Sequence, residues 1–296
     1  MLLKILESSR FYAHHYQLDD TGRTFRDYAK LTSDRLIFLV ASEIRMTKEL
    51  YDHSVPKFPL NIKIVGGAIG NTSLNSLTTI YSDVENIELV QNINRVVSID
   101  KNTRRPLPLP DWWKEKYSKT AKAHDALKMT KFEIPTGRTG FYQHKVAWSE
   151  TDLNEHTNWG SYFRYCVDAA HHCAKKGSLK HFRKNVSNGV RLVQCYFYGE
   201  SLEDDLLDIY CWEDPYDSKK LYFDIHREKV TEHTERKSVL KYIKNQGPET
   251  LCRYSSKRGV RFSLKLSRHL VAPYDEPLIL ERGPGFSATS IDNNNI

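Results

Sequence analysis

The sequence NWGSYFRYCVDAAHHCAK, residues 158–175, decides the fold. Its apolar side chains recur at helical spacing and share one face, which predicts a helix over 158–175. That face consists of Trp159, Tyr162, Phe163, Cys166, Ala170 and Cys173. Lys175, Lys176 and Gly177 suit the end of a helix, where cations and a left-handed residue are favoured. At ~1.5 Å per residue the helix would be about 27 Å long, so we expect it to be the central element of a domain.

Stretches with the period of β-strands follow this helix. Residues 206–212 and 221–226 alternate between inward and outward positions, as half-buried antiparallel strands do. Further strands are expected at 190–198, 238–243 and 260–266. A long helix followed by a meander of strands predicts an α+β domain whose sheet wraps the helix.

The first half of the chain shows a similar arrangement. If Trp159 is aligned with Phe25, the apolar face reappears as Phe25, Tyr28, Ala29, Thr32, Leu36 and Leu39. Strands are expected after this face at 60–69, 74–81 and 87–99. A repeat as long as a domain indicates a duplication, so we expect a second long helix over 25–39.

The segment between the halves has the composition of a linker. Residues 106–110 alternate proline with leucine, which favours a stiff extended segment, and a lysine-rich stretch over 111–131 is expected to be helical. We therefore expect a first domain over residues 1–118, a linker over 119–138 and a second domain over 139–282. Residues 283–296 are rich in glycine and polar residues, which predicts a disordered tail.

The bulk composition is that of a folded protein, with 40% hydrophobic and 27% charged residues. Glu7 and Arg10 interrupt the apolar start, so no signal peptide is expected, and no run reaches the ~20 apolar residues that span a bilayer. The five cysteines form no CxxC pair. We therefore expect no disulfide framework, no metal, no cofactor and a reduced, cytoplasmic compartment.

The formal net charge of +7 favours anionic partners, such as nucleic acid, the phosphates of coenzyme A or an acidic carrier protein. A basic surface without a specific partner explains the charge equally well. The sequence has no zinc-finger, helix-turn-helix or RNP signature, so nucleic acid is not expected as a partner.

The segment before the predicted helix carries a cluster of chemically useful side chains. Asp152, Asn154 and His156 stand at alternate positions and lead into the helix N-terminus. A carboxylate and an imidazole can act as base or nucleophile and move protons, and a helix start offers unpaired N–H groups for a developing oxyanion. The same residue types also cap helices, and this structural role is the alternative interpretation.

Three segments resemble one known family. The pattern Asp152-x-Asn154-x-His156-x-Asn158, with Tyr162 after it, is similar to the catalytic segment of acyl-carrier-protein thioesterases, a double-hotdog family. The segment Asn102-Thr103-Arg104-Arg105, with Pro110 and Glu115 after it, resembles the end of that family's first hotdog domain. The segment Tyr198-Gly199-Glu200-Ser201, before Asp205, resembles the strand that carries the family's catalytic glutamate.

The resemblance implies an α+β tandem hotdog fold, in which two long central helices are each wrapped by an antiparallel sheet. It implies hydrolysis of fatty-acyl thioesters to free fatty acid and thiol, and a donor that is either an acyl-carrier protein or coenzyme A. The implied catalytic residues are Asp152, Asn154, His156 and Glu200. The expected substrate-binding residues are Asn158, Arg104 and Arg105; the two arginines would meet the phosphates of the donor, and surface salt bridges are the alternative interpretation. A homodimer is compatible with this expectation.

The chain also departs from the family's pattern. Trp159 replaces an asparagine, and Ser201 replaces the cysteine of plant members, so a cysteine mechanism finds no support. We expect Cys195 to be a core residue. In the first half, Leu18, Asp20 and Gly22 align with the catalytic cluster and supply no imidazole, and His14 and His15 are expected to be structural residues on a strand.

Two other functions stay open from the sequence. A double-hotdog 3-hydroxyacyl dehydratase would need a histidine in one half and an acid across the groove in the other. A non-catalytic acyl-chain-binding protein would keep the fold without turnover.

Overall fold

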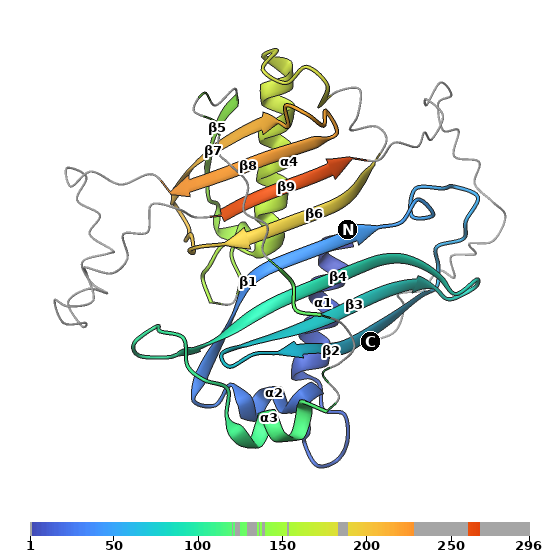
Figure 1. The fold of residues 1–296 in the computed structure, drawn as a ribbon, viewed down its shortest axis with the longest axis vertical. Helices are drawn as coiled ribbons and strands as arrows, with labels where there is room; N and C mark the ends of the chain where they lie inside the picture. Colours follow the sequence, from blue (N-terminus) through green and yellow to red (C-terminus); the bar gives the residue numbers. More distant parts are fainter. Residues whose placement is uncertain are drawn as a thin grey trace, which may run out of the picture.

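The computed structural model describes residues 2–119, 121, 125–128, 135, 137, 140–152, 154–182, 189–227 and, for the backbone, 260–266. Within these residues nine strands form one antiparallel sheet in the order β2-β3-β4-β1-β6-β9-β8-β7-β5 (Figure 1). The strands are β1 (Arg35–Met46), β2 (Leu60–Ile69), β3 (Ser73–Ser82), β4 (Ile87–Asp100), β5 (Gly140–Lys145), β6 (Val190–Phe197), β7 (Leu206–Glu213), β8 (Lys220–Arg227) and β9 (Val260–Leu266). The strands of the first half therefore lie at one end of the sheet and those of the second half at the other.

The helix expected over 158–175 is confirmed as α4 (Trp159–Lys175). Asn158 is its N-cap, because its side-chain oxygen accepts a hydrogen bond from the N–H of Gly160 at 2.8 Å. The helix buries Tyr165, Cys166 and Ala170 against strands of the second half. The long central helix of this half thus follows from its apolar face.

The helix expected over 25–39 is wrong. Only η1 (Phe25–Asp27) and α2 (Tyr28–Leu31) are helical there, and residues 35–46 form β1. Arg26 and Asp27 have positive φ angles of 55° and 50°, which a continuous helix does not allow. The long helix of the first half is instead α1 (Leu2–His15), which lies behind β1–β4 as α4 lies behind β5–β9 (Figure 1).

The other helices and strands expected from the sequence agree with the structure only in part. His14 and His15 end α1 and do not lie on a strand. The helix expected over 111–131 is described only as α3 (Asp111–Tyr117). All of the expected strands that fall on described residues are confirmed within a few positions, whereas β1 and β5 were not predicted. The strand expected at 238–243 and the tail at 283–296 lie outside the described residues.

The two halves share one sheet and one core. β1 pairs with β6 in antiparallel register from Ala41↔Tyr196 to Arg45↔Leu192, which joins the two sets of strands. The main core cluster includes Ile44 and Ile80 of the first half together with residues of the second half. None of the described helices is long and apolar enough to cross a membrane.

Candidate active site

The loop between η3 (Trp148–Glu150) and α4 is shaped by the side chain of Asp152. One carboxylate oxygen accepts hydrogen bonds from the backbone N–H groups of Asn154, at 2.8 Å, and His156, at 3.3 Å. The N–H of Asp152 donates to the carbonyl of His156 at 2.7 Å, and Glu155 takes a left-handed conformation with φ 62°. Asp152 therefore fixes the positions of Asn154 and His156, and no described residue hydrogen-bonds to its second oxygen.

Asn158 closes this loop. Its N–H donates to the carbonyl of Glu150 at 2.8 Å, and its side-chain amide donates to the carboxylate of Glu7 on α1. Its side-chain oxygen caps α4, and its carbonyl accepts from the N–H of Ser161 at 2.9 Å. These bonds occupy the N–H groups of Gly160 and Ser161 at the start of the helix, where the sequence predicted unpaired N–H groups for an oxyanion.

Glu200 is brought to the loop from the segment after β6. Thr157 and Ser201 are joined twice, through the Thr157 N–H to the Ser201 carbonyl and between their hydroxyls, both at 2.7 Å. The hydroxyl of Tyr162 lies 2.7 Å from the same Ser201 hydroxyl. This buried network places the carboxylate of Glu200 3.3 Å from Nε2 of His156.

Arg104 of the first half reaches the same carboxylate. One guanidinium nitrogen lies 2.8 and 2.9 Å from the two oxygens of Glu200, and the guanidinium rests over the ring of Phe38 at 4.6 Å. Arg104 therefore orients Glu200, and its charge is already paired. Arg105 is exposed and is not among the residues that line the cavity described next.

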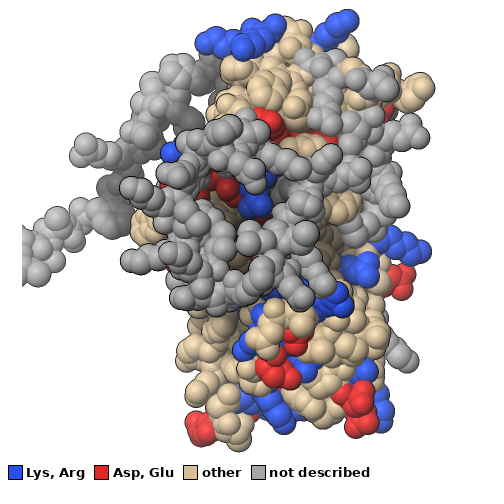
Figure 2. Space-filling model, turned by 90° about the vertical axis from the view of Figure 1, so that its left-hand side faces the viewer, with Lys and Arg blue, Asp and Glu red and all other residues tan. Residues whose placement is uncertain are grey.

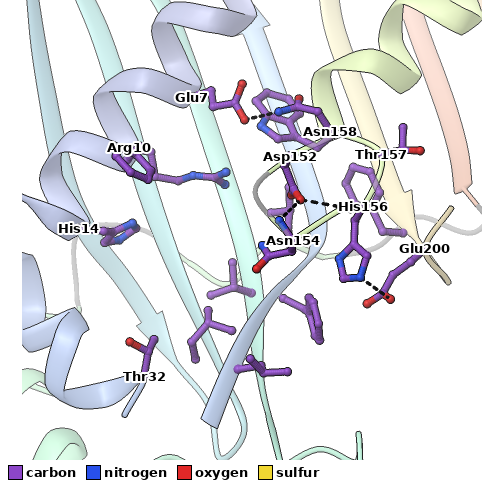
Figure 3. Close-up of a pocket in the computed structure, with 18 of the residues that line it drawn as sticks. Glu7, Arg10, His14, Thr32, Asp152, Asn154, His156, Thr157, Asn158 and Glu200 are labelled. Carbon is purple, nitrogen blue, oxygen red and sulfur yellow. Dashed lines mark hydrogen bonds and ion pairs between the residues drawn. The ribbon is translucent and has the colours of Figure 1, made fainter. Parts of the chain in front are cut away.

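These residues line a cavity of about 1190 Å³ that both halves enclose. Asp152, Asn154, His156 and Glu200 lie along one side of it, and the ring nitrogen of His156 that is not paired with Glu200 faces the cavity (Figure 3). The structure thus brings together all four residues suggested as catalytic, and adds Asn158 and Arg104 beside them. Its placement of Arg104 on Glu200 was not expected from the sequence.

The other wall carries residues that the sequence did not single out as a site. Glu7, Arg10 and His14 of α1 point to the cavity from one stripe of that helix (Figure 3). Burial, and then the charge of Arg10, lower the pKa of His14 to about 3, so its imidazole is neutral at physiological pH. The sequence signal that could have indicated this wall is the spacing of Glu7, Arg10 and His14, which places the three side chains on one face of a helix.

Comparison of the fold with solved structures returns thioesterases. A 12:0-ACP thioesterase from Umbellularia californica matches 90% of this chain and 88% of its own, with a TM-score of 0.60 and 11% identity. An acyl-ACP thioesterase from Bacteroides thetaiotaomicron matches 89% of this chain and 87% of its own, with a TM-score of 0.57 and 11% identity. The chain has the tandem hotdog fold. No protein-family model matches the sequence, and no curated protein matches it either.

The tandem hotdog fold confirms the expected fold class and the resemblance at the level of architecture. Its two central helices are α1 and α4, and the first lies nearer the N-terminus than the sequence repeat predicted. In the first half, Leu18, Asp20 and Gly22 lie in the connection after α1 and do not line the cavity. The cluster of carboxylate, amide and imidazole therefore belongs to the second half.

The four cysteines that the structure describes, Cys166, Cys173, Cys195 and Cys211, are all buried. Cys195 is buried on β6, and burial raises the pKa of its thiol, which confirms the expectation of a core residue. Among the described residues, no group of three or more His, Cys, Asp or Glu side chains is placed to hold a metal ion.

The net charge of +7 predicted a surface rich in cationic side chains. Figure 2 shows one side of the molecule, on which Lys and Arg side chains gather at the upper end and are mixed with Asp and Glu in the lower part. This side thus presents cations to solvent, as a net charge of +7 leads one to expect.

Proposed function

We propose that this chain hydrolyses acyl thioesters carried on a phosphopantetheine arm, either of an acyl-carrier protein or of coenzyme A, to a free acid and a thiol. The observation that carries the proposal is the cavity itself. It places the His156–Glu200 pair, the second oxygen of Asp152 and the side-chain amide of Asn154 along one side of a space large enough for an acyl chain.

The geometry suggests a separate role in the reaction for each of these residues. His156 takes a proton from the attacking water, because one ring nitrogen faces the cavity and the other lies against Glu200. Glu200, itself held by Arg104, stabilises the imidazolium that forms. Asn154 donates to the carbonyl oxygen, and Asp152 keeps both residues in place. The proton held by His156 then passes to the departing thiolate.

The first test is a thiol-release assay over acyl-coenzyme A and acyl-carrier-protein substrates of varied chain length. His156→Ala and Glu200→Gln should each lower kcat by about a hundredfold or more, because acid–base groups contribute about 10²–10⁴-fold. Asp152→Asn should lower kcat by a similar factor, because an amide weakens the hydrogen bonds that hold Asn154 and His156 in place. Asn154→Ala should cost somewhat less if the residue only orients the carbonyl. Melting temperatures should change little in all four variants.

Asp20→Asn is the control, because Asp20 lies in the first half away from the cavity. If the cluster only caps α4, the variants would lose about 0.5–2 kcal/mol of stability and keep their activity. Dehydration of 3-hydroxyacyl substrates, followed by absorbance of the enoyl product, would instead identify a dehydratase. Tight acyl-chain binding without release of thiol would identify a binding protein.

A further inference from the structure

The two walls of the cavity differ in chemistry. Leu36, Ile37, Phe38, Leu39, Leu74 and Val96 form an apolar wall on β1, β3 and β4. Arg10, His14 and Tyr28 line the cavity from α1 and α2. A plain hydrocarbon chain would suit the apolar wall and would leave the polar groups of the other wall without water, which is costly.

Arg10 is the central group of the polar wall. It is half-buried, and its guanidinium extends toward the cavity beside the labelled side chains of Asp152 and Asn158 (Figure 3). No hydrogen bond or ion pair joins Arg10 to any other residue in the described part of the chain, although its guanidinium lies 6.0 Å from the ring of Trp159. Burial lowers the pKa of Arg10 against the opposing effect of Glu7, and an arginine stays charged under such a shift.

The acidic neighbours of Arg10, Glu7 and Asp152, each use one carboxylate oxygen in the loop before α4, and their charges still act on Arg10. Glu7 accepts from the side-chain amide of Asn158, and Asp152 accepts from two backbone N–H groups. The described lining as a whole carries four Lys or Arg side chains against three Asp or Glu. The cavity therefore has a guanidinium with free donors and a small excess of positive charge.

Two neutral groups flank Arg10. The ring of His14 stacks on that of Tyr28 at 4.3 Å, which fixes both side chains on this wall. The hydroxyl of Tyr28 has no hydrogen-bond partner among the described residues and lies within the electrostatic reach of Arg10. A guanidinium and a nearby hydroxyl together offer several donors to one planar, anionic acceptor.

We propose that Arg10 is a specificity-determining residue, and that the acyl group preferred by this cavity carries a carboxylate which pairs with Arg10 while its methylenes lie on the apolar wall. This inference rests on the proposed function and names its substrate class. Pairing is favourable there because an arginine binds a carboxylate through two parallel hydrogen bonds, which are stronger away from bulk water.

The test compares coenzyme A thioesters in matched pairs: succinyl with butanoyl, adipoyl with hexanoyl, and sebacoyl with decanoyl. At one chain length or more, kcat/KM should be about ten- to a hundredfold higher for the carboxylated member, the range for a hydrogen bond to a charged group. Arg10→Met should remove this preference, because it keeps the packing of the stem and removes the charge. Arg10→Lys should restore part of it, and Tyr28→Phe should reduce it.

Lys4→Met and Tyr12→Phe are the matched controls. They remove a charge and a hydroxyl from exposed positions of α1 that do not line the cavity, and the preference should survive in both. An equal loss on both members of each pair in Arg10→Met would overturn the inference, since Arg10 would then bind a phosphate of the donor or serve the fold. A wild type that prefers the methyl-ended member of every pair would also overturn it.

A binding measurement separates this inference from the proposed function. If no thioester is cleaved by the wild type, the proposed function fails, and calorimetry with adipate and hexanoate decides the inference alone. Adipate should bind the wild type at least about tenfold more tightly than hexanoate, and Arg10→Met should abolish the difference. Equal binding of the two acids by the wild type would refute the proposal.

Discussion

Ser201 joins the two segments on which the candidate site depends. Its hydroxyl lies 2.7 Å from the hydroxyls of both Thr157 and Tyr162, and it is buried. Ser201→Ala should lower the free energy of unfolding by about 1–3 kcal/mol, because buried polar groups lose a partner. It should also lower kcat, because Glu200, the preceding residue, is placed against His156 by this network.

Denaturant unfolding and steady-state kinetics measure both effects of Ser201→Ala. Ser8→Ala is the matched control, since Ser8 is exposed on α1 and does not line the cavity. An unchanged midpoint of unfolding would show that the three hydroxyls do not form a network. An unchanged kcat with reduced stability would show that Glu200 is placed by other contacts.

At the same scale, the residues themselves indicated the loop cluster, Glu200 came only from the family resemblance, and the pairing of Arg104 with Glu200 was not predicted. Asp152, Asn154 and His156 were found because they stand within one loop, where spacing limits their geometry. The pairing of Arg104 with Glu200 joins residues 96 positions apart. Such a contact depends on how the two halves meet, and neither residue has a local pattern that indicates the other.

At the scale of elements, α1 shows why a periodic pattern misled. Its inner face carries Glu7, Arg10 and His14 because it lines a cavity, so it lacks a continuous apolar stripe. The stretch over 25–39 showed such a stripe by coincidence of spacing, although Ile37, Phe38 and the following β-branched residues favour a strand. The polar residues by which α1 lines the cavity therefore obscured the apolar pattern that would have predicted the helix.

Glu150 links strand β5, η3 and α4. Its carboxylate accepts from the Ala147 N–H at 2.9 Å and the Tyr165 hydroxyl at 2.8 Å, and lies 2.8 Å from Nε2 of His144. Burial opposes the charge of Glu150, but these hydrogen bonds outweigh burial and lower its pKa below the ordinary 4.5. The carboxylate of Glu150 thus joins the three elements next to the candidate site.

Because the folded-state pKa of Glu150 is lowered, its charge stabilises the fold above the unfolded-state pKa, and this stability is lost as pH falls through the folded-state pKa. Glu150→Gln should therefore lower the free energy of unfolding at neutral pH by about 1–3 kcal/mol. The difference from wild type should shrink below about pH 4.5, the ordinary value. Urea denaturation at a series of pH values measures it, with the exposed Glu203→Gln as control. A difference that grows on acidification would contradict the role assigned to Glu150.

At the scale of the whole molecule, the division into residues 1–118, 119–138 and 139–282 remains our proposal for how the sequence is organised. The sheet is continuous across that division, because β1 of the first half pairs with β6 of the second. The core is also continuous, since Ile44 of the first half and Val193 of the second are buried in one cluster. The candidate site also draws Arg104 from one half and Glu200 from the other.

Separating the halves should therefore leave neither of them stable. A fragment of residues 1–130 would expose β1 as an edge strand, and a fragment of residues 131–296 would expose β6, each with unpaired backbone groups and uncovered apolar side chains such as Ile44 and Val193. Long exposed edges of this kind promote aggregation. We expect each fragment to be insoluble or to unfold without cooperativity, and the full chain to unfold in a single transition. Co-expression should recover a soluble complex, because pairing of β1 with β6 restores the sheet. Two soluble fragments that each unfold cooperatively would show that the halves are independent domains, and that the shared sheet contributes little to their stability.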